Sequence, residues 1–308
     1  MSKSSAPMPT ASTRPAGPTD ARADLGMRVR DLVALTKPRI TLMVILTAAA
    51  GMWLAPSIAP GAALLALFAL SLVVAAANAL NCYLERDIDK LMVRTARRPL
   101  PAQRLDPKVA LAFSMALAVI SVPLLVFAVN PATGVLGALS LALYVGVYTP
   151  LKQKAPVALL VGAIPGAMPP LMGWTSATGT IDAPGLVLFG ILFLWQLPHF
   201  IAISTFREKE YSNAGHKVLP AVRGRRMGYL HAVFWATLLV PVAVALEPLG
   251  VAPRSYTVIA AVSSVAFLVI TVAELRPSRG DRGALRVFIA SLLYLPVVFA
   301  ALLLSTLF

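Results

Sequence analysis

Nine long apolar stretches constrain this chain more than any other feature of its sequence. None of them contains Asp, Glu, Lys or Arg, and most approach the roughly 20 residues that an α-helix needs to cross a bilayer. The runs are continuous rather than alternating, which favours helices over a membrane β-barrel. The sequence therefore predicts an all-α polytopic membrane protein with nine transmembrane helices. The expected spans are 40–59, 62–84, 109–129, 131–149, 155–174, 186–206, 227–246, 257–273 and 287–308.

The basic residues are distributed very unevenly over the segments between these spans. Of 27 Lys and Arg residues, 26 lie before the first span or after an even-numbered span, and Arg254 is the exception. This positive-inside pattern predicts a cytoplasmic N-terminus and, after nine crossings, a C-terminus outside. The net charge of +14 is therefore explained by topology, and we expect no nucleic-acid partner.

The first 30 residues differ in composition from the rest of the chain. They are rich in Pro, Ser, Ala and Thr and lack the apolar segment of a signal peptide, which predicts a disordered cytoplasmic tail before a membrane domain at 31–308. Their prolines argue against a mitochondrial transit helix, so a bacterial inner (plasma) membrane is favoured over a mitochondrial one. The single cysteine, Cys82, excludes an internal disulfide and a cysteine metal cluster.

An acidic segment follows the second span directly. Asn81, Glu85 and Asp89 recur every four residues, so on a continuing helix they form one stripe, whereas Asp87 faces elsewhere. Carboxylates at a membrane helix end are costly unless they pair, reach water or hold a cation. Several arginines follow at once, and carboxylates beside arginines suit a metal ion that in turn holds a phosphate.

A second polar segment, 207–226, follows the sixth span and resembles the first, 85–108, in its order of acids, bases and Leu-Pro. The two could converge on one site. If the sixth helix continued through Arg207, then His199 and Glu210, eleven residues apart, would share a face. This favours Glu210 over Glu208 as the second acid.

Three further residues have more than one reading. The buried imidazole of His199, with Gln196 on the same face, could ligate heme iron, act as a base or hydrogen-bond a neighbouring helix. Lys152, at the end of the fourth span, is either a topology anchor or a phosphate contact, and we favour the contact.

The fifth span holds six helix breakers, which suit either a cavity wall or close helix packing: Gly162, Pro165, Gly166, Pro169, Pro170 and Gly173.

Five short blocks together resemble a known superfamily. The acidic segment with the arginines after it looks like the first metal–diphosphate motif of the intramembrane aromatic prenyltransferases. Within that superfamily the remaining blocks are similar to the protoheme IX farnesyltransferase (heme O synthase) branch, and Trp-Gln-Leu-Pro-His-Phe is the most specific. Cys82 stands where many superfamily members carry Asp, and this also favours the heme branch. The other blocks are 34–39, 148–152, 166–170 and 195–200.

The resemblance implies nine helices around a central cavity with two acidic motifs at its mouth. It implies Mg²⁺ as cofactor, farnesyl diphosphate as donor, heme B as acceptor, and heme O as a product for terminal oxidases. A heme A synthase or the oxidase assembly machinery would then be the partner within the lipid bilayer. The implied roles are metal binding and catalysis for Glu85, Asp89 and Glu210 with Asn81, diphosphate binding for Arg94, Arg98 and Lys152, and heme binding for His199 and Gln196.

Besides a purely structural assembly factor, which would not need a phosphate-type site, two other functions remain open at this point. One is a prenyltransferase with another aromatic or lipid acceptor, against which His199 and Cys82 argue. The other is a membrane transporter, because a broken span and membrane acids also suit ion pathways. The acids cluster beside arginines at one face and none lies at mid-span, which favours the enzyme.

Overall fold

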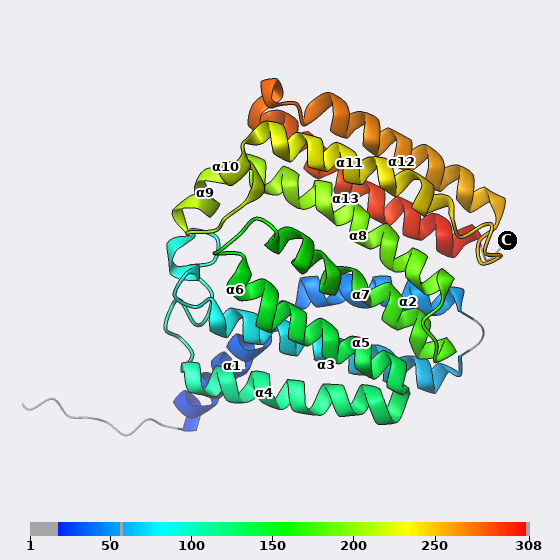
Figure 1. Cartoon of the computed structure of the whole chain (residues 1–308). Coiled ribbons are helices and arrows are strands. Elements are labelled where there is room, and N and C mark those ends of the chain that lie inside the picture. The colour runs from blue at the N-terminus through cyan, green and yellow to red at the C-terminus, as the bar shows by residue number, and fades with distance from the viewer. Residues whose placement is uncertain (1–17, 56–57, 306–308) are drawn as a thin grey trace, which may run out of the picture.

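The computed structural model describes residues 18–55 and 58–305, which form helices and no β-strand (Figure 1). Eight helices are long and apolar enough to cross a membrane. A ninth span is reached if 26–35 and α2 (Pro38–Leu54), two pieces that meet at a bend of 50°, cross the membrane together. The all-α polytopic prediction is confirmed, with eight or nine candidate spans.

The helix bounds agree with the expected spans to within five residues, except that the last helix begins at Gly280, seven residues before the expected 287. Residues 257–273, the shortest expected span, belong to a helix of 21 residues. The remaining spans are α3 (Pro60–Leu84), α4 (Pro107–Pro123) with η2 (Leu124–Val129), α5 (Pro131–Ala142) with η3 (Leu143–Tyr148) and α6 (Thr149–Leu151), α7 (Ala158–Thr178), α8 (Ala183–Phe206), α11 (Arg225–Val244), α12 (Arg254–Glu274) and α13 (Gly280–Ser305). Shorter elements lie between them: η1 (Asp89–Leu91), α9 (Glu208–Asn213), α10 (Leu219–Arg223) and η4 (Pro277–Arg279).

Residues 18–35 form α1, so the last part of the predicted tail is helical, and 1–17 lie outside the described residues. The division into tail and membrane domain stays a prediction.

Local sequence accounts for several helix starts. Proline occupies the first turn of α2, α3, α4 and α5, where its missing N–H costs nothing. Asp106 and Asn130 accept hydrogen bonds from the backbone N–H groups of Lys108 and Thr133, which caps α4 and α5.

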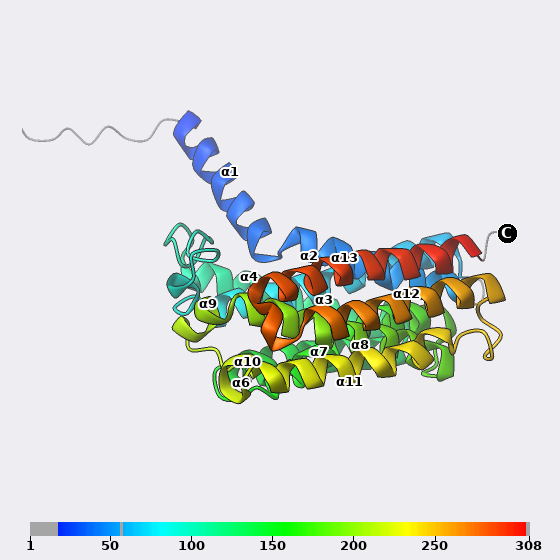
Figure 2. The same ribbon diagram turned by 90° about the horizontal axis from the view of Figure 1, so that it is seen from above.

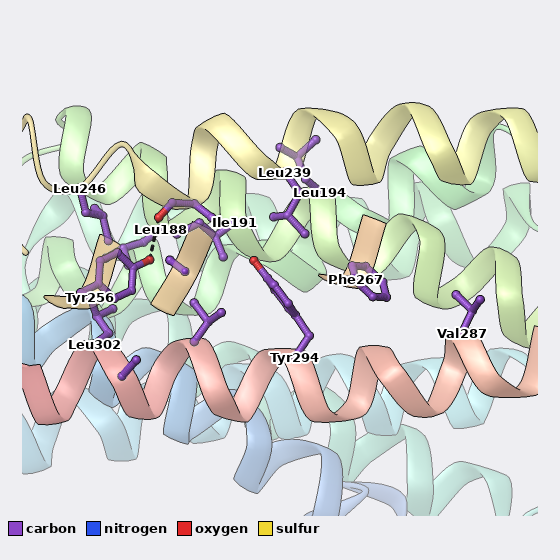
Figure 3. Packing of buried hydrophobic residues seen from close by; sticks show 14 of the residues in the cluster. Leu188, Ile191, Leu194, Leu239, Leu246, Tyr256, Phe267, Val287, Tyr294 and Leu302 are labelled. Carbon is purple, nitrogen blue, oxygen red and sulfur yellow. Dashed lines mark hydrogen bonds between the residues drawn. The ribbon is translucent and has the colours of Figure 1, made fainter. Parts of the chain in front are cut away.

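The spans pack in two groups. One contains α2, α3, α4, α5 and α7, and the other contains α8, α11, α12 and α13 (Figures 1 and 2). They join where α8 packs against α7 and where α13 packs against α2. Figure 3 shows the core of the second group, in which Tyr256 of α12 donates a hydrogen bond to the carbonyl of Ala243 at 2.9 Å. The polar segments 85–106 and 207–224 lie at one end of the bundle, which we call the polar end, and the C-terminus lies at the other (Figure 1).

The proline-rich fifth span is one helix, α7, and is not broken as its sequence suggests. A Cβ on Gly173 would come within 1.8 Å of the Ala48 carbonyl oxygen, so α2 and α7 are in backbone contact. Small residues permit such close approach in membranes. Pro165 and Gly166 meanwhile line a cavity. Both expected roles of the helix breakers are therefore present: Pro165 and Gly166 form part of a cavity wall, and Gly173 allows close helix packing.

Candidate functional site at the polar end

The first acidic motif keeps its stripe although α3 ends at Leu84. The backbone continues the helical pattern, because Glu85 N–H donates to the Asn81 carbonyl and Asp89 N–H to the Glu85 carbonyl, at 3.0 and 2.8 Å. Glu85 and Asp89 are 4% and 1% exposed. Asp87 has a side chain that is 70% exposed and pairs with Lys90. Two acids are therefore buried together and the third is in solvent.

Each buried acid has a cation as partner. Arg98 donates to Asp89 Oδ2 at 2.7 Å, and Lys152 forms an ion pair with Glu85. Lys152 follows the end of α6, so this pair joins the end of the second span, α3, to the end of the fourth. Two of the three expected diphosphate contacts thus lie beside the expected metal ligands. Arg94 is exposed and lies within electrostatic range of Tyr211.

Lys37 is a site residue that sequence reasoning missed. It lies at the bend between α1 and α2 with φ of 51°, a left-handed backbone that is rare for lysine. Its Nζ donates to Asn81 Oδ1 at 2.8 Å, and Asn81 Nδ2 donates to Thr149 Oγ1 at 3.1 Å. The sequence signal was its place in block 34–39, one of the blocks that resemble the family.

The second motif departs from the expected geometry. The sixth helix does not continue through Arg207: α8 ends at Phe206, Arg207 adopts φ of −108° and ψ of 19°, and α9 begins at Glu208. The assumption that placed His199 and Glu210 on one helical face is therefore wrong. Glu210 pairs with Arg207 and Glu208 pairs with Arg225, both at 3.0 Å.

The two motifs nevertheless converge. The backbone N–H of Lys217 donates to the Lys152 carbonyl at 2.9 Å. His216 is 6% exposed, has an Nδ1 without a hydrogen-bond partner, and lies within electrostatic range of Lys152 and Asp89. Burial, assisted by Lys152, lowers the pKa of His216 to about 4, so the imidazole is neutral at pH 7.

The acids can be tested for their fit to a metal ion. Within the described ranges, no three His, Cys, Asp or Glu side chains are gathered closely enough to hold one. Yet Asp89 Oδ1 and Glu210 Oε1 are buried without a hydrogen-bond partner, and Glu85 Oε1 has only its ion pair with Lys152. Free carboxylate oxygens are what Mg²⁺ prefers. The donor chemistry fits, whereas the ligand set is not assembled.

An apolar cavity of about 120 Å³ opens beside this cluster. It lies between α2, α3, α5 with η3, and α7, and Asn78 and Tyr144 are its most polar lining residues. Asn78 is one helical turn from Asn81, and Thr149, the partner of Asn81, donates to the Tyr144 carbonyl at 2.8 Å. The site thus combines a charged head region with an apolar tail region.

His199 and Gln196 contact different neighbours of α8, namely α13 and α7. His199 Nδ1 is 2.7 Å from Ser291 Oγ of α13, and its ring stacks on Trp195 with centroids 5.0 Å apart. Ser291 Oγ donates to the Phe288 carbonyl, so we assign the Nδ1–H tautomer, which leaves the lone pair on Nε2. Gln196 donates to the Ala163 carbonyl of α7 at 2.7 Å. Neither residue lines the cavity described above.

A buried group of acids and cations at one end of an apolar cavity, between membrane helices, is a site for a ligand with an anionic head and an apolar tail. The chain belongs to the UbiA prenyltransferase family, whose match covers residues 44–293. Solved structures share the fold. A digeranylgeranylglyceryl phosphate synthase structure aligns with a TM-score of 0.79 at 17% identity over 91% of this chain and 98% of its own. A UbiA homolog from Archaeoglobus fulgidus bound to DMAPP and Mg²⁺ aligns with a TM-score of 0.68 at 15% identity, over 88% and 99%.

Much more similar sequences are named protoheme IX farnesyltransferase. The relative from Anaeromyxobacter dehalogenans is 48% identical over 90% of this chain and 94% of its own length. That from Sorangium cellulosum is 49% identical over 85% of this chain and its whole length. The resemblance inferred from the sequence blocks is thereby confirmed.

Proposed function

We propose that the protein transfers the farnesyl group of farnesyl diphosphate to a vinyl group of heme B, with addition of water, and releases heme O and diphosphate. The heme O would serve terminal oxidase biogenesis. The observation that carries the proposal is the charged cluster beside the apolar cavity, in a chain almost half identical to proteins named for this reaction.

The charged cluster is suited to the diphosphate. Arg98 and Lys152 already occupy the site as partners of Asp89 and Glu85, so they can contact phosphate oxygens with little rearrangement. Arginine binds phosphate through two parallel hydrogen bonds, whereas lysine acts as a point charge. Arg94, near Tyr211, would close the site from the side of the second motif.

Glu85, Asp89 and Glu210, with Asn81, would hold Mg²⁺. When bound, the metal neutralises the charge that develops on the leaving diphosphate. For all three acids to ligate one ion, Glu210 must exchange its Arg207 pair for the metal, and segment 207–217 must approach the first motif.

The cavity is suited to a part of the prenyl chain. Its walls are largely apolar and keep water away from an allylic cation. A cavity of about 150 Å³ holds a benzene ring, so this one of about 120 Å³ accepts only a part of a farnesyl chain. The remainder would lie between helices or against lipid.

The bond changes need no protein nucleophile. The allylic C–O bond of the donor breaks, and its electrons leave with the diphosphate. The vinyl group of the heme supplies the electron pair for the new C–C bond, which leaves a cation next to the porphyrin ring. Water adds to that carbon and gives up a proton, so a hydroxyl group remains. The residues bind, orient and exclude water.

His199 is the proposed heme contact. The Nδ1–H bond to Ser291 fixes the ring and leaves Nε2 as a lone-pair donor of the kind that ligates heme iron. Gln196, one turn earlier on α8, would orient the acceptor from the side of α7.

Product analysis by mass spectrometry tests the proposal. Purified protein in detergent receives heme B, farnesyl diphosphate and Mg²⁺, and a parallel sample contains EDTA. A hydroxyethylfarnesyl heme that forms only with Mg²⁺ is expected. If a prenylated product appears only with a different acceptor, the protein is a prenyltransferase but heme B is not its acceptor. Absence of any prenyl transfer by folded protein would reject both.

A further inference from the structure

Lys37 lies where the proposed function would place a metal ion. Its Nζ lies 2.8 Å from Asn81 Oδ1, the oxygen expected to face the metal. It is also within electrostatic range of Glu85, Asp89 and Arg98. The terminal nitrogen of Lys37 therefore lies among the charged groups of the site.

The backbone holds Lys37 there by an unusual conformation. Its φ of 51° and ψ of 64° lie in the left-handed region, which only Gln103 shares among the non-glycine residues of the described ranges. Such strain persists only where neighbours enforce it, and it gathers at functional sites. Here the carbonyl of Thr36 accepts hydrogen bonds from Asn78 and Thr41, at 3.2 and 2.8 Å. The bend is thus fixed to α3 and α2.

The charges of the cluster indicate what Lys37 does. Arg98 and Lys152 pair with Asp89 and Glu85, whereas the hydrogen-bond partner of Lys37 is the neutral amide of Asn81. A cation at this position opposes the binding of a bare metal ion and favours an anion. Lysine also has a flexible stem, so its ammonium can move from the amide oxygen to a phosphate.

We propose that Lys37 is a placeholder cation: it occupies the Asn81 oxygen while the site is empty, and it transfers to the diphosphate when metal and diphosphate bind together. Metal binding thereby becomes dependent on diphosphate. The inference rests on the proposed function for the identity of the diphosphate ligand, and it adds a residue and a coupling that the reaction itself does not require.

The test measures binding rather than turnover, with Mn²⁺ as a paramagnetic substitute for Mg²⁺. Wild type and Lys37→Met are titrated with Mn²⁺ alone and followed by electron paramagnetic resonance. Diphosphate affinity is measured separately by calorimetry, with farnesyl thiodiphosphate at saturating Mg²⁺. Lys37→Gln repeats both measurements with a neutral polar side chain, in case the methionine variant does not fold.

The two affinities should move in opposite directions. Without the ammonium, Mn²⁺ alone should bind roughly tenfold more tightly, and the thiodiphosphate roughly tenfold more weakly, since hydrogen bonds to charged groups have energies of that order. Lys90→Met removes an exposed cation that pairs with Asp87, and both affinities should stay unchanged. Weakening of both in folded Lys37 variants would mean a structural role and overturn the proposal, as would no change in Mn²⁺ affinity.

The outcome is separate from that of the proposed function. Mn²⁺ titration uses neither heme nor a reactive prenyl donor, so a failure to make heme O would leave this result standing. Conversely, the wild-type protein could make heme O while Lys37→Met behaves as wild type in both titrations. That result would support the proposed function and overturn the proposed role of Lys37.

Discussion

The substitution Gly173→Ala tests whether α2 and α7 are as close as the structure places them. An added Cβ would lie 1.8 Å from the Ala48 carbonyl oxygen, and 2.7 and 3.0 Å from the carbon atoms behind it. Non-bonded heavy atoms need about 3.5 Å, so the helices would have to separate by roughly 1.7 Å. Because the obstacle is backbone, no side-chain rotation can relieve it.

The cost can be bounded. Overpacking costs about 1–3 kcal/mol and occasionally more, and a clash with backbone belongs at the upper end. Replacing helical glycine by alanine returns about 1 kcal/mol through helix propensity. We therefore expect Gly173→Ala to lower the free energy of unfolding by about 2 kcal/mol. Gly51, which meets the Pro170 carbonyl in the same interface, would lose contact when the helices separate, and this adds to the loss.

Thermal unfolding in detergent, followed by intrinsic fluorescence or dye binding, measures the effect. The matched control is Gly146→Ala in η3, where a Cβ meets no atom within 4 Å, and its midpoint should stay the same or rise slightly. If Gly173→Ala unfolds at the same temperature as Gly146→Ala, then α2 and α7 are not in backbone contact and the cavity beside them is wrongly shaped.

Three further predictions concern the site. Asp89→Asn should reduce heme O formation at least roughly 100-fold in folded protein, whereas Asp87→Asn, at an exposed acid, should stay near wild type; equal losses would reject the assignment of the buried acid. His199→Ala should weaken heme binding, read from the Soret band, while thiodiphosphate binding survives, and an unchanged heme affinity would exclude His199 as the ligand. For His216 the folded pKa of about 4 lies below the unfolded value near 6.5, so the unfolded state binds more protons as pH falls from 6.5 to 4. Stability should fall across that window by up to about 3 kcal/mol, and His216→Gln, compared by thermal unfolding at pH 7 and pH 4.5, should lose less; equal losses in both proteins would contradict the burial.

The sequence predicted the structure correctly where one physical effect, such as burial in the bilayer or helical periodicity, decides it. The hydrophobic requirement of a bilayer located the spans. Asn81, Glu85 and Asp89 recur every four residues, and this spacing placed them on one side even though α3 ends before Glu85. The burial of both acids and the exposure of Asp87 followed from the same spacing.

The sequence did not predict features that depend on contacts between distant residues or on where a helix ends. Lys37 adopts a left-handed conformation next to the Thr36 carbonyl, which accepts a hydrogen bond from Asn78 of α3, and that distant contact is not visible in local sequence. The helix break at Arg207 moved Glu210 off the face of His199. The prolines of α7 did not break it, because a packed neighbour can support a helix that lacks hydrogen bonds.

The two packing groups are also consecutive along the chain. The first, α2 to α7, contains the charged cluster and the cavity, and the second, α8 to α13, contains His199 and its partner Ser291. During synthesis the first group can therefore complete its internal contacts while the second is still absent. The last span, α13, then supplies the Ser291 contact of His199 and packs on α2, so the bundle closes into a ring only when its final helix arrives.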